Sequence, residues 1–136
     1  MKKTPVRSKT TGKRLLILAA LLILAAAAAL LYPRPASTFQ GDLVKNPDEY
    51  RMDARIMNGS DSHVITLKAS DTLRVHFEPR SGQMKLEILA PDGSALYSGD
   101  GTACSDFDLN LPADGDYRMN VAGENASGEL LIRPVR

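Results

Sequence analysis

The stretch from Thr72 to Leu89, TLRVHFEPRSGQMKLEIL, contains two runs of alternating apolar and polar residues on either side of a turn sequence, Pro79–Gly82. Successive side chains of a β-strand point to opposite faces, so this alternation places the apolar set on a buried face and the polar set in water. The stretch therefore predicts two strands, residues 72–78 and 84–89.

The same pattern extends in both directions, with turn residues at intervals of roughly 8–12 positions. The connections are too short to contain a crossover helix, so the strands are expected to be antiparallel, and the neighbouring runs 63–68 and 72–78 to form a hairpin. We expect an all-β domain, an antiparallel β-sandwich of jelly-roll or immunoglobulin-like type. About eight strands are predicted: 50–57, 63–68, 72–78, 84–89, 94–98, 106–111, 117–121 and 128–133.

The sequence Leu111–Tyr117, LPADGDY, places a tyrosine two residues after the turn glycine Gly115. A tyrosine in this position can bury its ring at a corner of a sheet and return its hydroxyl to a nearby backbone group. Tyr117 is therefore predicted to be a buried structural residue.

The segment from Val64 to Ile132 resembles bacterial pre-peptidase C-terminal (PPC-like) β-sandwich domains. The resemblance is carried by LRV at 73–75, MKLEI at 84–88, PDG at 91–93, FDL at 107–109 and LPADGDYRMNV at 111–121. It implies a β-sandwich with an accessory, non-catalytic role, of the kind such modules have beside secreted enzymes.

Residues 15–32, LLILAALLILAAAAALLY, form an uninterrupted apolar run of 18 residues without a charge, glycine or proline. As a helix this run would span about 27 Å, enough to cross the hydrocarbon core of a bilayer. Six lysines and arginines lie in residues 1–14, whereas only Arg34 follows closely. This bias predicts a basic cytoplasmic tail (1–14), a transmembrane signal anchor (15–32), a linker (33–49) and an extracytoplasmic β-sandwich domain (50–136) at the cell membrane.

A cleaved signal peptide is the competing interpretation of the N-terminus. Residues 25–29 are all alanine and offer small-residue cleavage sites behind an apolar run. The apolar run continues past these sites and is longer than the usual signal-peptide core of about 7–15 residues, which favours the uncleaved anchor.

Charge and cysteine content exclude several classes of function. After residue 36 the chain has 16 acidic and 10 basic residues, a net charge of −6, which argues against nucleic-acid binding. The lone cysteine, Cys104, cannot form an intrachain disulfide. No motif of a known nucleophile, zinc protease or nucleotide site occurs, so we expect neither an enzyme nor a cofactor.

Aspartates gather at two predicted loops. Asp100, Asp106 and Asp108 surround one loop, and Asp114 and Asp116 flank another. Calcium prefers several carboxylate and carbonyl oxygens, so Asp100, Asp106 and Asp108 are candidate calcium ligands. Aspartate is also a default residue of tight turns, and turn chemistry is the favoured interpretation.

Two functions are left open by the sequence. The first is a single-pass bacterial envelope protein whose β-sandwich has a structural or protein-interaction role, with the membrane and an unknown envelope protein as partners. The second is a secreted accessory module that binds calcium or carbohydrate after signal-peptide cleavage.

Overall fold

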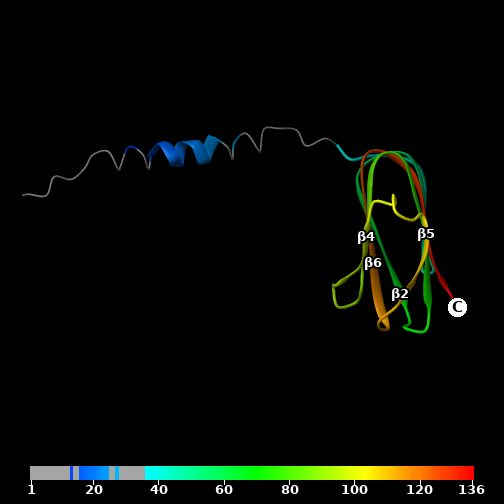
Figure 1. Ribbon diagram of the computed structural model, residues 1–136. Helices are drawn as coiled ribbons and strands as arrows, with labels where there is room; N and C mark the ends of the chain where they lie inside the picture. The colour runs from blue at the N-terminus through cyan, green and yellow to red at the C-terminus, as the bar shows by residue number, and fades with distance from the viewer. Residues whose placement is uncertain (1–12, 14–15, 25–26, 28–35) are drawn as a thin grey trace, which may run out of the picture. The chain divides into compact units, whose positions relative to one another are not determined.

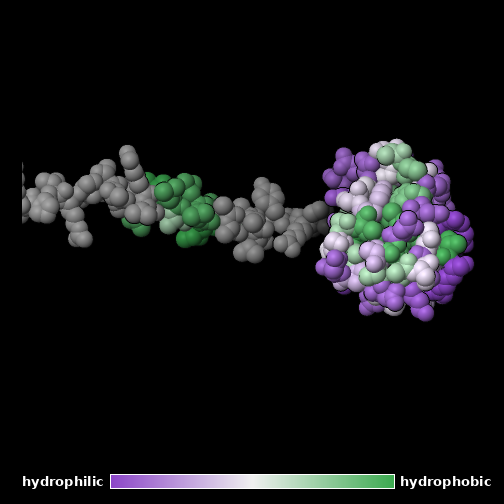
Figure 2. Space-filling view, turned by 60° about the horizontal axis from the view of Figure 1, so that its bottom comes forward, coloured by the Kyte–Doolittle hydropathy of each residue, from purple (hydrophilic) through white to green (hydrophobic). Residues whose placement is uncertain are grey.

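The computed structural model describes residues 13, 16–24, 27 and 36–136. The chain divides into two compact units, Met1–Pro35 and Ala36–Arg136. Residues 16–24 are helical, apolar and exposed (Figures 1 and 2). Among the described residues, no helix is both long enough and apolar enough to cross a membrane. Except for residue 27, the rest of the predicted anchor and of the candidate cleavage sites lies outside the described residues, as does nearly all of the predicted tail.

Residues 36–136 form six strands joined in one antiparallel sheet. The order across the sheet is β1-β2-β6-β3-β4, and β5 pairs with the first part of β3, on the side of β3 opposite β6. The strands are β1 (Thr38–Asn46), β2 (Glu49–Leu67), β3 (Thr72–Leu89), β4 (Ala95–Gly99), β5 (Asp106–Asn110) and β6 (Gly115–Val135). The prediction of an all-β antiparallel domain is confirmed.

The three long strands β2, β3 and β6 bend over, so that one sheet supplies two facing halves (Figure 1). The first half contains β1, residues 49–57 of β2, 128–135 of β6, 72–79 of β3, and β5. The second contains residues 59–67 of β2, 115–123 of β6, 83–89 of β3, and β4. The arrangement is sandwich-like, but the expected pair of separate sheets is wrong.

The predicted count of about eight strands is also wrong, because three turn sequences lie inside strands. Residues 58–61, 79–82 and 123–127 shift the pairing register without ending the ladder. Gly82 lies in the left-handed region at φ +68°, and a Cβ there would overlap the backbone carbonyl of Asn125. Local turn residues therefore bend the strands here instead of terminating them.

Two further expectations about neighbouring segments are corrected. Residues 63–67 and 72–78 do not form a hairpin, because β2 and β3 are not neighbours in the sheet and the turn between them crosses from one half to the other. The predicted linker 33–49 contains β1, which pairs with β2 over its whole length and bulges between Gln40 and Gly41.

The facing halves enclose one core of 20 buried apolar residues. Most come from the predicted alternating positions of β2, β3 and β6. Tyr117 is fully buried, and its hydroxyl donates to the backbone oxygen of Ala113 at 2.6 Å. The predicted tyrosine corner is confirmed. The largest fully buried side chains are Tyr50, Tyr117, Phe77, Met52, Ile65, Leu67, Leu73, Leu86, Ile88, Met119, Leu130 and Ile132.

Candidate functional site

The core is open along one side, between β1 and the second half of β2. Phe39 lies opposite Met57 in the ladder and Leu43 lies opposite Met52, so all four side chains share the inner face of the sheet. Met52 and Met57 are buried, whereas Phe39 and Leu43 are each 39% exposed. The first half has β1 as an extra strand at this edge, whereas the second half ends with residues 59–67 of β2. No strand of the second half therefore covers Phe39 and Leu43.

The resulting edge cleft has Phe39 and Leu43 at its rim and Met52 and Met57 at its floor. Its volume is about 170 Å³. Within residues 36–136, no further strand pairs with the outer edge of β1. The cleft therefore places an apolar hollow directly beside unpaired backbone donors and acceptors.

A polar cluster closes one end of the edge cleft. Lys45 donates from Nζ to Asp61 Oδ1 at 2.7 Å and to the backbone oxygen of Ser62 at 3.0 Å. Tyr50 donates its hydroxyl to Asp61 Oδ2 at 2.6 Å. Burial and this hydrogen bond to the carboxylate raise the pKa of Tyr50 well above its ordinary value, so the hydroxyl stays protonated. These bonds tie the end of β1 to the second half of β2.

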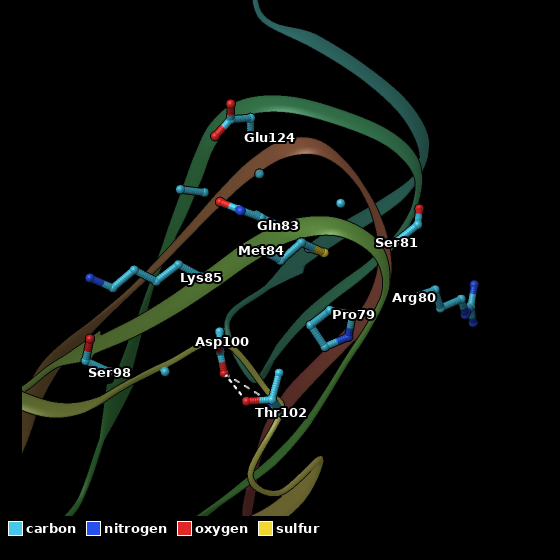
Figure 3. Close-up of a pocket in the computed structure, with 14 residues that line it drawn as sticks. Pro79, Arg80, Ser81, Gln83, Met84, Lys85, Ser98, Asp100, Thr102 and Glu124 are labelled. Atoms are coloured by element: carbon cyan, nitrogen blue, oxygen red, sulfur yellow. Dashed lines mark hydrogen bonds between the residues drawn. The ribbon is translucent and has the colours of Figure 1, made fainter.

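A larger hollow of about 1070 Å³ lies on the opposite side, between the bend of β3, β4 and the start of the β4–β5 loop (Figure 3). Its labelled side chains are mostly polar, and Arg80 extends away from the others. The guanidinium instead bonds to Asp53 at 3.3 Å and to Glu129 at 2.8 Å. The residues that line this hollow include neither histidine nor cysteine, and they offer no nucleophile paired with a base.

Each of the three candidate calcium ligands, Asp100, Asp106 and Asp108, contacts a different side chain. Asp100 accepts hydrogen bonds from Thr102, which lower the pKa of its carboxyl. Asp106 contacts His76 Nδ1 at 2.7 Å, and Asp108 is paired with Arg74 at 3.0 Å. Asp106 and Asp108 share the outer face of β5, but among the described residues the three carboxylates do not converge on one point.

The second predicted aspartate pair also serves the backbone and a hydroxyl. Asp114 accepts from the backbone nitrogen of Ala69 at 2.7 Å, and Asp116 accepts from Thr66 Oγ1 at 2.6 Å. The first bond joins the turn before β6 to the turn after β2, and the second joins the start of β6 to the end of β2. Asp114 thus supports a turn, as the sequence favoured, whereas Asp116 joins paired positions of β6 and β2.

Apart from Phe39 at the rim of the edge cleft, the aromatic residues of the described strands are buried or partly buried. Tyr50, Phe77 and Tyr117 are fully buried. Tyr97 and Phe107 are partly buried and pack on each other with ring centroids 4.5 Å apart. On the face shown in Figure 2, hydrophobic residues of the domain lie in small groups between hydrophilic ones.

Sequence reasoning missed the rim of the edge cleft because Phe39 and Leu43 fell inside the predicted linker. A weak signal was present, since Phe39, Gly41 and Leu43 alternate with polar residues and Asn46-Pro47-Asp48 is a turn sequence. The run carries only two large apolar residues on its inward face. It was therefore too short to be distinguished from a polar connection.

Comparisons with known proteins do not establish a family. No family model matches the chain, and no curated protein matches it. A solved structure similar in fold is PliG of Aeromonas hydrophila, a periplasmic lysozyme inhibitor of g-type lysozyme. It is 19% identical, with a TM-score of 0.48, over 69% of this chain and 92% of that chain.

Another similar structure is that of accessory secretory protein 1, 2 and 3 in Streptococcus pneumoniae. It is 11% identical, with a TM-score of 0.36, over 77% of this chain and 93% of that chain. Neither likeness assigns a family or a function to this chain.

Proposed function

We propose that this protein is a membrane-anchored, extracytoplasmic and non-catalytic module that binds an extended segment of another envelope protein at the edge cleft. The observation that supports it is the position of two half-exposed apolar side chains, Phe39 and Leu43, beside the outer edge of β1. A segment that pairs with this edge gains backbone hydrogen bonds and can place an apolar side chain against Met52 and Met57.

The size of the cleft supports a protein segment as the ligand. A hollow of about 170 Å³ accommodates an aliphatic or aromatic side chain. Backbone pairing would supply affinity, and the apolar hollow would supply specificity for the side chain that enters it. Natural edge strands are usually protected by charges or bulges, and β1 has its bulge at Gln40 and Gly41, which limits pairing with arbitrary chains.

The anchored, extracytoplasmic location is supported by the sequence of the first 34 residues. The basic residues of 1–14 precede the apolar run 15–32, and orientation follows the excess of positive charge on the cytoplasmic side. A reporter that is active only outside the cytoplasm should be active when fused after Arg136 and silent when fused near residue 14. The opposite pattern would contradict the orientation.

Site-specific photo-crosslinking tests the binding site in intact cells. A photoreactive amino acid is placed in the full chain at Phe39 or Leu43, with Ser98 on β4 as the matched exposed control on the opposite edge. We expect one common adduct from positions 39 and 43, no such adduct from position 98, and loss of the adduct from position 39 when Leu43→Asp is added.

The stability of the Leu43→Asp chain provides the second control. Leu43 is 39% exposed, so the substitution should change the free energy of unfolding only modestly. Equal crosslinking from positions 43 and 98, or none from either rim position, would contradict the edge cleft as the binding site.

A further inference from the structure

A second surface lies on the outer face of the first half-sheet, away from the inward-facing edge cleft. His76 and Glu78 are two residues apart on β3, so their side chains leave the same face of the strand. Glu129 lies directly opposite Glu78 on β6. One ligand atom from each of His76, Glu78 and Glu129 lies within 4.8 Å of the other two.

The charges around this group are unbalanced. Glu78, Glu129 and Asp53 form one cross-strand row over β3, β6 and β2, and like charges directly opposite one another destabilise a sheet. Arg80 bonds both Glu129 and Asp53. The partner of Glu78 is His76, whose Nε2 lies 3.5 Å from Glu78 Oε2, a contact that becomes an ion pair only when the imidazole is protonated. With neutral His76, the row of three carboxylates and one guanidinium keeps a net charge of −2.

The imidazole of His76 is oriented as in a metal site. Its Nδ1 lies 2.7 Å from Asp106 Oδ1, and a carboxylate can only accept, so Nδ1 carries the proton. In the neutral ring this leaves the lone pair on Nε2, which faces Glu78. A carboxylate that holds the remote nitrogen of a histidine is the usual support of a metal-bound imidazole.

The separation of two of the donors, His76 Nε2 and Glu78 Oε2, fits a small tetrahedral ion, and the third donor, from Glu129, lies within 4.8 Å of both. Two ligands of zinc at about 2.0–2.1 Å from the metal, at a tetrahedral angle, are roughly 3.4 Å apart. His76 Nε2 and Glu78 Oε2 are 3.5 Å apart, longer than a good hydrogen bond and close to this separation.

We propose that His76, Glu78 and Glu129 bind a divalent transition-metal ion, zinc being the ion that suits one imidazole and two carboxylates, with Asp106 as the positioning residue. The three side chains are partly exposed, so the fourth position of a tetrahedral ion is open to water. Calcium, which prefers oxygen ligands alone, fits this group poorly. The site lies outside the proposed protein-binding cleft and does not depend on it.

Zinc titration of the tag-free full chain in detergent, after removal of metals by a chelator, tests the proposal. The variants are His76→Gln, Glu78→Gln and Glu129→Gln. His63→Gln is the matched control, because His63 lies on β2 and contacts the backbone oxygen of Asn46 instead. We expect the wild type and His63→Gln to bind one zinc ion per chain and to gain thermal stability. The three site variants should bind at least about tenfold more weakly.

Asp106→Asn separates positioning from simple structural support. The variant should weaken zinc binding by about 10–100-fold and change the ring-nitrogen chemical shifts of His76 in the metal-free protein, while the chain stays folded. Saturable binding that survives His76→Gln, binding lost equally in His63→Gln, or no saturable binding to the wild type would overturn the proposal. Stabilisation by calcium equal to that by zinc would overturn the assignment to a transition metal.

Discussion

Tyr117 combines a fully buried ring with a hydroxyl that bonds to Ala113, so the contributions of the two parts can be separated by substitution. Tyr117→Ala should lower the free energy of unfolding by about 3–5 kcal/mol, because it removes a large core side chain. Tyr117→Phe should cost about 1 kcal/mol, since it removes one hydrogen bond.

Denaturant unfolding of the full chain in detergent measures both changes. Tyr97→Phe is the control, because Tyr97 is only partly buried, and its free-energy change should stay within about 0.5 kcal/mol. If Tyr117→Ala changed stability as little as Tyr97→Phe, the corner would have no structural role.

Asp108 gives a prediction of pH dependence at the same scale. The hydrogen bonds and charge of Arg74 hold the pKa of the Asp108 carboxyl below its ordinary value of about 3.9. A carboxyl with a lowered folded-state pKa stabilises the fold above its unfolded-state pKa, and this contribution is lost as the pH falls through the folded-state value. NMR titration should show a midpoint below the ordinary value, moving up in Arg74→Gln and in high salt. An unchanged midpoint in Arg74→Gln would exclude the ion pair as the cause.

For Tyr117 and the loop aspartates, the sequence predicted burial or exposure better than it predicted the hydrogen-bond partners. Tyr117 was identified because its partner lies four residues away in the same turn. The partners of Asp106 and Asp108 are His76 and Arg74, about 30 residues earlier on a neighbouring strand. Such pairs depend on strand register, which a single sequence does not specify.

The bend of β3 shows why a turn sequence was mistaken for the end of a strand. Pro79–Gly82 has the residues of a tight turn, and it does redirect the chain. The ladder with β6 nevertheless resumes at Gln83, because β6 bends at the matching position. Alternation predicted the faces of β3 and β6 and most of β2, but it placed Ile56 inward and Met57 outward, and the register shift after Ala54 reverses these two. Strand continuity depended on a partner that local sequence does not show.

Gly82 and Gly93 form a matched pair for testing this bend. Both have positive φ, +68° and +86°, but a Cβ would meet the Asn125 backbone at Gly82 and nothing within 4 Å at Gly93. Gly93→Ala should cost about 1 kcal/mol from backbone conformation alone, and Gly82→Ala at least about 1 kcal/mol more. Thermal or denaturant unfolding measures the difference. Equal costs would mean that the close approach of β3 and β6 is relaxed in solution.

At the scale of the whole molecule, the net charge of −6 after residue 36 means that any cation can stabilise the domain by screening, so a specific effect of calcium must exceed this general one. Asp100, Asp106 and Asp108 are already bonded to different groups, so calcium at about 1 mM should raise the melting temperature no more than monovalent salt of equal ionic strength. A calcium-specific rise that Asp106→Asn abolishes would support the calcium-binding alternative, since a ligand of the native state stabilises by mass action.

The continuous strands also determine how the domain opens. Because β2, β3 and β6 each run through both facing halves and the halves enclose one core, opening of either half exposes core side chains of the other. Amide protons of the buried strands on the two halves should therefore exchange with solvent in a single cooperative event, at one common free energy of opening. Faster amide exchange, from local fraying, is expected in the short strands β4 and β5, each of which pairs with β3 alone in the described sheet.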